Sequence, residues 1–178
     1  GQFVQTKLTH SRWLQARLVN CTFLQSDLSQ SNWQGANISR CIMLELNANQ
    51  VDSSQVQASK VQFSCMADFR QVNLTHSRWH SCGFRNLDLA GCKADHGVFI
   101  ECDMGESQFH DASLVKTLFK SCVMMMAEFN HADCTEALFF ETSLRKAIFD
   151  HTDLSAATLQ NCNCAETQFI ECDSLEFV

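Results

Sequence analysis

The sequence predicts an all-β solenoid whose coils turn four corners, and three regularities of its 178 residues predict it. The first is a large apolar residue at every fifth position, with a small residue two positions before it. The second is a further period of 20, at which cysteines and phenylalanines recur. The third is the absence of proline, which has little place in a coil whose backbone amides pair with coils on both sides.

The period of five is clearest over residues 82–144 and fits neither ordinary element. Five residues advance an α-helix by about 500°, so the large residues would form no stripe. In a straight strand an odd repeat would alternate between the two faces. The pattern closes only if the chain turns a corner after each pentapeptide. The large slots hold Phe84, Leu89, Phe99, Met104, Phe109, Leu114, Phe119, Met124, Phe129, Phe139 and Leu144, with Ala94 and Cys134 as small exceptions.

The period of 20 places residues from successive coils above one another. One side carries Cys21, Cys41, Cys82, Cys102, Cys122 and Cys162, with Val61 and Thr142 filling the gaps. A second side carries Phe69, Phe109, Phe129, Phe149 and Phe169. We expect both sets to form the structural core.

Three local segments carry a family resemblance: Ala67-Asp68-Phe69, Ala132-Asp133-Cys134 and Thr152-Asp153-Leu154. They match the pattern A(D/N)LXX, so the chain resembles the pentapeptide-repeat family. The resemblance implies a right-handed quadrilateral β-helix, here of about nine coils.

Taken in order, the register is regular from Phe3 to Met43, and it inverts in size between residues 46 and 61. One extra residue is then needed near Ser64-Cys65-Met66, most simply as a bulge at a corner. A rival parse with two three-residue insertions breaks the cysteine column, so we prefer the single insertion. We expect residues 44–66 to be the least regular part.

The register then holds from Phe69 to the end, which predicts one solenoid domain over residues 1–178. Both ends of such a coil would leave unpaired strand edges, which solenoids normally cap. This favours either end-to-end association or a domain of a longer protein, and we prefer the second.

The sequence offers little catalytic chemistry. No nucleophile–base pair, glycine-rich phosphate loop or carboxylate pair has a convincing spacing, so we predict no enzyme and no cofactor. The cysteines are interpreted as small core residues in a reducing compartment, which favours the cytoplasm. Asp111, His131, His151 and Glu171 stack as an outward column that could hold a divalent metal, but a solvated ladder is the preferred interpretation and we predict no metal.

The register also sorts the surface. Outward apolar residues in successive coils predict a contiguous patch, and such patches usually mark an interface. The predicted interface residues are Val98, Ile100, Leu118, Val123, Met125, Met126, Leu138 and Phe140. A lesser stripe of Val4, Leu24 and Leu44, with Ile42 beside it, would continue as Ser64 and then Arg85.

Charge is uneven along the chain. Residues 1–65 hold five cations and three anions, a net of +2, and residues 66–178 hold eight and 17, a net of −9. The C-terminal half should repel nucleic acid, and aspartate before the large residue is also the repeat's own preference. Arg17, Arg40, Lys60 and Arg78 cluster on the side that later becomes apolar.

Two functional classes remain. The first is a non-catalytic protein–protein interaction or scaffold module, which binds a protein partner or flanking domain, with a homodimer as one form. The resemblance adds that bacterial segments of this kind occur in larger chains, including secretion-associated proteins. We expect no direct nucleic-acid binding, and no apolar run of about 18 residues predicts a membrane span.

The second class is a DNA mimic. Quinolone-resistance members of the family are acidic rods that occupy the DNA-binding saddle of DNA gyrase, so the resemblance implies inhibition or protection of gyrase or another topoisomerase. This chain departs from them in its slightly basic N-terminal half and in lacking their C-terminal helical dimerisation segment.

Overall fold

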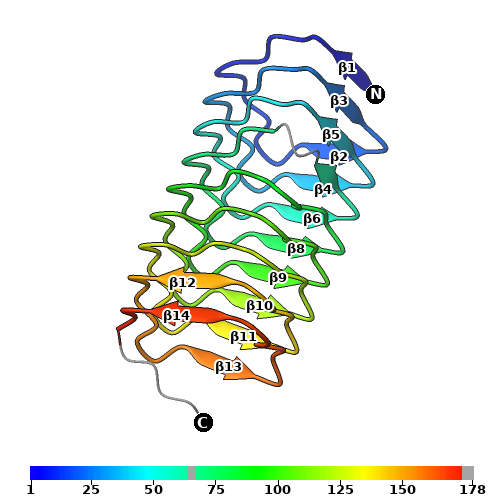
Figure 1. Ribbon diagram of the computed structural model, residues 1–178. Helices are drawn as coiled ribbons and strands as arrows, with labels where there is room; N and C mark the ends of the chain where they lie inside the picture. The colour runs from blue at the N-terminus through cyan, green and yellow to red at the C-terminus, as the bar shows by residue number, and fades with distance from the viewer. Residues whose placement is uncertain (64–66, 174–178) are drawn as a thin grey trace.

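The structure is a computed structural model that describes residues 1–63 and 67–173 as a rod of stacked coils (Figure 1). Within these residues there is no helix, and therefore none that is long and apolar enough to cross a membrane. The strands are short: β1 Gln2–Val4, β2 Arg17–Val19, β3 Thr22–Leu24, β4 Asn37–Ser39, β5 Ile42–Leu44, β6 Gln57–Ser59, β7 Gln62–Phe63, β8 Arg78–His80, β9 Val98–Ile100, β10 Leu118–Lys120, β11 Leu138–Phe140, β12 Ile148–Asp150, β13 Thr158–Gln160 and β14 Gln168–Ile170.

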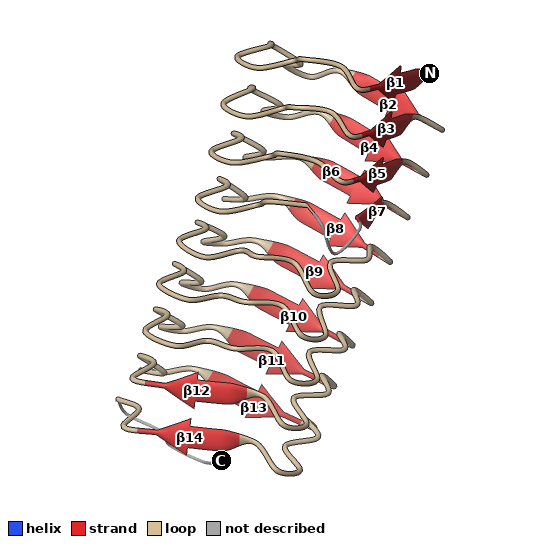
Figure 2. Ribbon diagram, turned by 45° about the horizontal axis from the view of Figure 1, so that its top comes forward, coloured by secondary structure: helices blue, strands red, loops and turns tan. Residues whose placement is uncertain are grey.

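The strands form parallel sheets along the sides of the rod (Figure 2). One side is an eight-stranded sheet in the order β13-β11-β10-β9-β8-β6-β4-β2, which we call the long sheet. The side that follows it begins with the four-stranded sheet β1-β3-β5-β7, which we call the short sheet. Isolated parallel bridges such as Lys7↔Asp27 and Arg12↔Asn32 follow the other two sides, and the first of these sides ends in the two-stranded sheet β12-β14. The predicted quadrilateral β-helix is confirmed, with eight strands in the long sheet, one per coil, against the expected nine or so coils.

The bulge predicted at Ser64-Cys65-Met66 lies outside the described residues, but the pairing on either side counts the residues between. Ile42 pairs with Gln62, an offset of 20, whereas Asn47 pairs with Asp68 and Gln62 with Gly83, offsets of 21. One extra residue therefore lies between Phe63 and Ala67, and the rival parse with two insertions is wrong. Of the segment 44–66, which we expect to be the least regular part, the strands up to Phe63 keep the 20-residue register because backbone pairing tolerates the change of side-chain size.

The corners depend on left-handed backbone. The residue two positions after each large slot has a positive φ, as at Gln5 (50°), Arg40 (52°) and Lys60 (54°). This conformation is unfavourable for residues other than glycine. Each corner gains a backbone hydrogen bond in return, as where Gln5 N donates to Leu24 O at 2.8 Å and Arg40 N to Ser59 O at 3.0 Å. The turn after each pentapeptide is therefore stabilised by the coil beside it.

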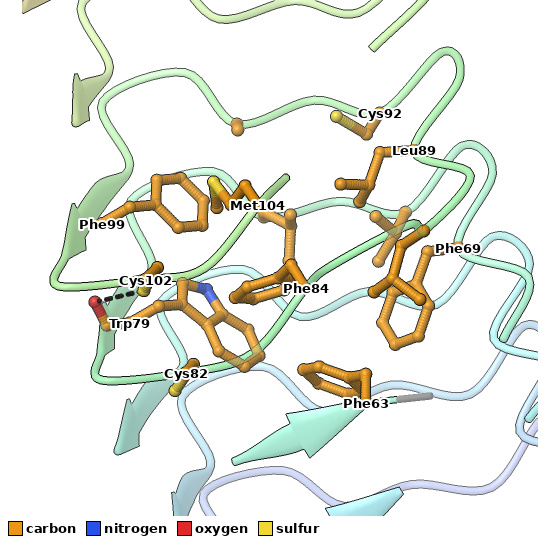
Figure 3. Packing of buried hydrophobic residues seen from close by; sticks show 14 of the residues in the cluster. Phe63, Phe69, Trp79, Cys82, Phe84, Leu89, Cys92, Phe99, Cys102 and Met104 are labelled. Carbon is orange, nitrogen blue, oxygen red and sulfur yellow. Dashed lines mark hydrogen bonds between the residues drawn. The ribbon is translucent and has the colours of Figure 1, made fainter. Parts of the chain in front are cut away.

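The interior is filled by aromatic rings, other large apolar side chains and small ones such as Cys82 and Cys102 (Figure 3). Phe129 stacks on Phe109 at 5.1 Å and on Phe149 at 4.5 Å between ring centres, with planes within 4° of parallel. Phe169 continues this stack at 5.1 Å and is partly exposed. Offset-stacked aromatic pairs add to the free energy of burial, so this column is a main source of stability.

The size inversion leaves a void in the third coil. Ala48 and Ser53 occupy slots that hold larger side chains in neighbouring coils, and both are buried. A cavity of about 20 Å³ remains there, lined by residues that include Trp33, Phe69 and Trp79. The larger Leu46, Val51, Val56 and Val61 in the small slots refill only part of the space.

Candidate interaction surface

The long sheet positions the central part of the predicted interface. Val98, Leu118 and Leu138 are direct partners on β9, β10 and β11, so they form one row along the rod. The next outward row holds Ile100, Lys120 and Phe140. Both rows point outward because Phe99, Phe119 and Phe139, which lie between them in sequence, are buried.

The rest of the predicted interface lies round the corner on a single coil. Val123 pairs with Asp103 on one side and Ser143 on the other, so its apolar neighbours are Met125 and Met126 of the same coil. We call these eight residues the apolar patch. Leu138 is 45% exposed, Val123 43% and Met126 42%, and the other five are half-buried. The structure therefore groups the predicted residues on one surface, and their role in binding stays a prediction.

One charged side chain, that of Lys120, interrupts the apolar patch. Lys120 lies between Ile100 and Phe140, and its ammonium nitrogen is 5.4 Å from the centre of the Phe140 ring. A cation over a ring face is attracted by the ring quadrupole. The ring thus shares its exposed face with a charge supplied by the neighbouring coil.

The N-terminal half of the long sheet is basic. Arg17 and Arg78 lie on β2 and β8, and Arg40 and Lys60 lie at the adjoining corner. We call these four residues the basic cluster. Arg78 pairs directly with Val98, so the basic cluster and the apolar patch meet on one sheet. A depression of about 300 Å³ lies at this junction, lined by Arg78, His80, Val98 and Ile100 and by the short side chain of Ser59.

The lesser stripe also forms. Val4 pairs with Leu24 and Leu24 with Leu44 across the short sheet. Val4 is 53% exposed, and Ser64 lies outside the described residues. This stripe occupies only the N-terminal coils and has half-buried leucines, so it is the smaller of the two apolar surfaces.

The histidine column is an ion-pair ladder. His151 contacts the Asp150 carboxylate at 2.7 Å and the Glu171 carboxylate at 2.8 Å, and its ring lies 5.2 Å from that of His131. The hydrogen bond that His151 donates to Asp150, together with both carboxylate charges, raises the pKa of His151 above its ordinary value. Among residues 1–63 and 67–173, no group of three or more His, Cys, Asp or Glu side chains is arranged so that it could hold a metal ion.

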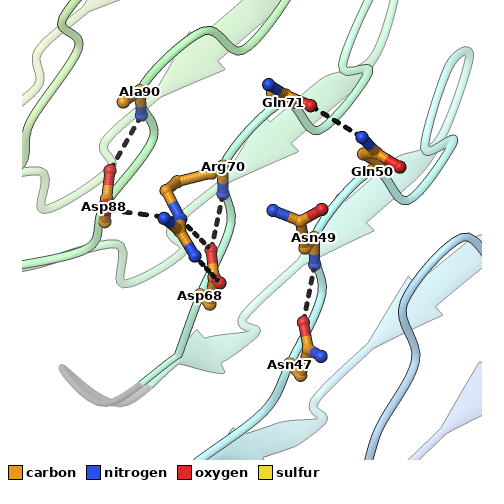
Figure 4. A network of polar contacts seen from close by, with 8 residues as sticks. All are labelled: Asn47, Asn49, Gln50, Asp68, Arg70, Gln71, Asp88 and Ala90. Carbon is orange, nitrogen blue, oxygen red and sulfur yellow. Dashed lines mark hydrogen bonds and ion pairs between the residues drawn. The ribbon is translucent and has the colours of Figure 1, made fainter.

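A second depression, of about 380 Å³, is lined mainly by polar side chains, which include Asp68, Arg70 and Asp88 (Figure 4). Its wall includes Arg70, which contacts Asp68 at 2.7 Å and Asp88 at 3.8 Å. The side-chain hydrogen bond from Arg70 lowers the pKa of Asp68. Because the charges in this depression already satisfy one another, it presents little unpaired chemistry to a ligand.

The cysteines are core residues. Cys41, Cys82, Cys102 and Cys122 are buried, Cys21 is 8% exposed, and Cys162 lies near the end of the stack and is half-buried. All ten cysteines of the described residues are free thiols. Burial raises the pKa of the Cys92 thiol to about 12, so it stays protonated and unreactive at neutral pH.

The hydrogen bonds that polar side chains make in the small slots were not predicted from the sequence. Thr117 Oγ1 donates to Ala94 O at 2.8 Å, and Cys122 Sγ donates to Phe99 O at 3.4 Å. Thr152 makes the same bond to Phe129 O at 2.6 Å. The spacing of 23 residues is common to all of them, and it is the signal that could have identified the bond. At several of these slots the small side chain therefore also donates a hydrogen bond to the preceding coil.

Comparison with known proteins supports the same architecture. The family model described as pentapeptide repeats (8 copies) matches residues 126–155 and 137–173. No curated protein matches the sequence. Among solved structures, a trypsin-treated form of QnrB1, a plasmid-mediated fluoroquinolone resistance protein, is 17% identical with a TM-score of 0.61, over 96% of this chain and 88% of that one.

Two further structures are similar. A second trypsin-treated form of QnrB1 is 18% identical with a TM-score of 0.60, over 96% of this chain and 88% of that one. HetL, involved in heterocyst differentiation regulation in the cyanobacterium Nostoc, is 15% identical with a TM-score of 0.42, over 90% of this chain and 84% of that one. At these identities the two QnrB1 structures show a shared fold.

Proposed function

Because this chain belongs to the pentapeptide-repeat family, we propose that it is a non-catalytic protein–protein interaction module whose apolar patch binds a protein partner or a flanking domain. The supporting observation is the row Val98, Leu118 and Leu138, which places apolar side chains outward on three consecutive strands. Contiguous apolar surface of this kind is uncommon on a protein without a partner. A second copy of the chain is one such partner.

The rod is suited to this role because the backbone of each coil is bonded to its neighbours. Outward side chains on paired strands then keep fixed spacings of about 4.8 Å along the axis. A rigid display of this kind loses little conformational entropy on binding. We propose that the protein acts in the cytoplasm, as part of a bacterial secretion-associated chain, since buried thiols suit a reducing compartment.

The test uses a photo-crosslinking amino acid at position 138 in cells that make the protein, with position 14 as the matched control. Leu138 is 45% exposed in the patch, and Leu14 is 42% exposed on another side. We expect a discrete adduct from position 138, lost when Leu118→Asp is added, and none from position 14. The β-type circular dichroism should be unchanged by Leu118→Asp and by Phe140→Asp. Equal adducts from both positions, or none from position 138, would contradict the proposal.

A second candidate is a ligand of DNA gyrase or another topoisomerase that mimics DNA. The observation that favours it is the net charge of −9 over residues 66–178 on a narrow rod. The purified protein should then inhibit supercoiling by gyrase, or protect the enzyme from a quinolone, at micromolar concentration. The basic cluster weighs against it, because DNA has no counterpart to those charges.

A further inference from the structure

The long sheet carries a basic surface and an apolar surface, which meet on neighbouring strands. From β2 to β8 its outward rows and adjoining corner carry the basic cluster, and from β9 to β11 they carry the apolar patch. Neighbouring strands lie about 4.8 Å apart, so Arg17 to Arg78 spans about 14 Å and Arg78 to Leu138 about another 14 Å. The two surfaces together are as long as about nine residues of extended chain.

The cations of the basic cluster differ from several cations of the C-terminal half, which form ion pairs. Lys116 contacts Glu136 at 3.4 Å, Arg145 contacts Glu166 at 2.9 Å, and Arg85 contacts Glu106, so each is neutralised by the following coil. Among residues 1–63 and 67–173, no carboxylate forms an ion pair with Arg17, Arg40, Lys60 or Arg78. These four charges are available to a partner.

The surface where the basic cluster meets the apolar patch is hollowed, so an extended peptide could lie in it. Asn37, Gln57 and Ser59 precede Arg78 and His80 on the sheet, and their shorter side chains leave the depression of about 300 Å³. Its wall changes from Arg78 and His80 to Val98 and Ile100 over one strand spacing. A ligand lying there contacts charge and apolar surface at once.

We infer that the long sheet binds a protein segment that is acidic at one end and apolar at the other, with its carboxylates on the basic cluster and its apolar side chains on the apolar patch. This inference rests on the proposed function and names the chemistry of the partner. A nucleic acid fits less well, because its phosphates would continue over Val98, Leu118 and Leu138, and the chain carries a net charge of −7. Complementary charge sets the orientation of the segment, and apolar burial supplies affinity.

The experiment selects ligands from a phage-displayed library of random peptides of about 12 residues, long enough to cover both surfaces. Selected peptides are synthesised with a fluorescent label and titrated with the intact protein. The first variant carries Arg40→Glu, Lys60→Glu and Arg78→Glu. Glutamate suits the left-handed corner of Arg40 and Lys60, since Glu101 and Glu141 already occupy the same corner with φ of 55° and 53°.

The matched control carries Lys7→Glu, Arg12→Glu and Lys93→Glu, which make the same change of net charge on other sides of the rod. We expect each selected peptide to carry Asp and Glu towards one end and Leu, Phe or Trp towards the other. The basic-cluster variant should raise Kd at least about tenfold, and the control less than about twofold. Leu118→Asp should also raise Kd at least about tenfold.

The outcomes separate the two proposals. If Leu118→Asp weakens binding but the basic-cluster variant does not, the inference is wrong and the proposed function stands. If the selection yields no peptide, or only peptides that depend on neither surface, both fail. If a labelled duplex DNA or RNA oligonucleotide binds more tightly than every peptide and loses affinity in the basic-cluster variant, the ligand is a nucleic acid and the inference is overturned.

Discussion

Lys120 of β10 holds its ammonium nitrogen 5.4 Å from the centre of the Phe140 ring on β11, although 20 residues separate them in the chain. The pairing Lys120↔Phe140 brings the two side chains to the same height on neighbouring coils. This contact places a charge against a ring of the apolar patch, and its contribution to stability can be measured.

We predict that Lys120→Ser lowers the free energy of unfolding by about 0.5–1 kcal/mol, because the cation no longer covers the ring. In a Phe140→Leu background the same change should cost less, and a double-mutant cycle by urea denaturation gives the difference. Lys93→Ser, whose nitrogen faces no ring in the described chain, is the control. A cycle with no coupling energy would show that the contact contributes nothing.

The void in the third coil predicts a stabilising substitution. Ala48→Val adds two methyl groups beside the cavity of about 20 Å³, and filling it should raise the free energy of unfolding by about 0.5–1 kcal/mol. Ala132→Val makes the same chemical change in a small slot that is 1% exposed, and there overpacking should lower stability. Thermal unfolding of both variants checks the sign, and a lower Tm for Ala48→Val would contradict the prediction.

We predict that truncating a phenylalanine of the column lowers the free energy of unfolding less when that residue lies near the C-terminal end of the column. Phe129 is fully buried between two stacked rings, so Phe129→Ala should cost about 3–5 kcal/mol. Phe169 stacks on Phe149 and is partly exposed, so Phe169→Ala should cost clearly less than Phe129→Ala. Chemical denaturation measures both values, and equal costs would mean that burial does not set the contribution.

The ladder at His151 predicts a pH dependence. The hydrogen bond that His151 donates to Asp150 raises the folded pKa of His151 above the ordinary 6.5. A raised pKa contributes stability that is fully present below pH 6.5 and is lost as the pH rises through the folded value. NMR titration should find the His151 pKa above that of the same residue in Asp150→Asn. Unchanged titration in that variant would mean that the pair does not form in solution.

We predict that the rate at which each cysteine is alkylated depends on how deeply its thiol is buried. Cys162, Cys164 and Cys172 are half-buried near the end of the described chain, whereas Cys92 and Cys134 are fully buried and their pKa values are raised by that burial. With iodoacetamide at neutral pH, the first group should be alkylated first and the second only after unfolding. Peptide mapping by mass spectrometry resolves each site. Early labelling of Cys92 would show that the coils open locally.

The sequence by itself determined the square coil, because only a corner after every pentapeptide brings its large residues to one interior. It also placed the extra residue between Phe63 and Ala67 and grouped Val98, Leu118 and Leu138 on one side, since a strict period makes distant positions neighbours. What the tertiary structure decided depends on the lengths and directions of side chains. These are the void beside Ala48, the hydroxyl and thiol bonds to the preceding coil, the cation of Lys120 over Phe140, and the ion pairs that neutralise Arg145 but leave Arg78 free. A repeat gives the register of each residue, whereas only coordinates give the reach of its side chain.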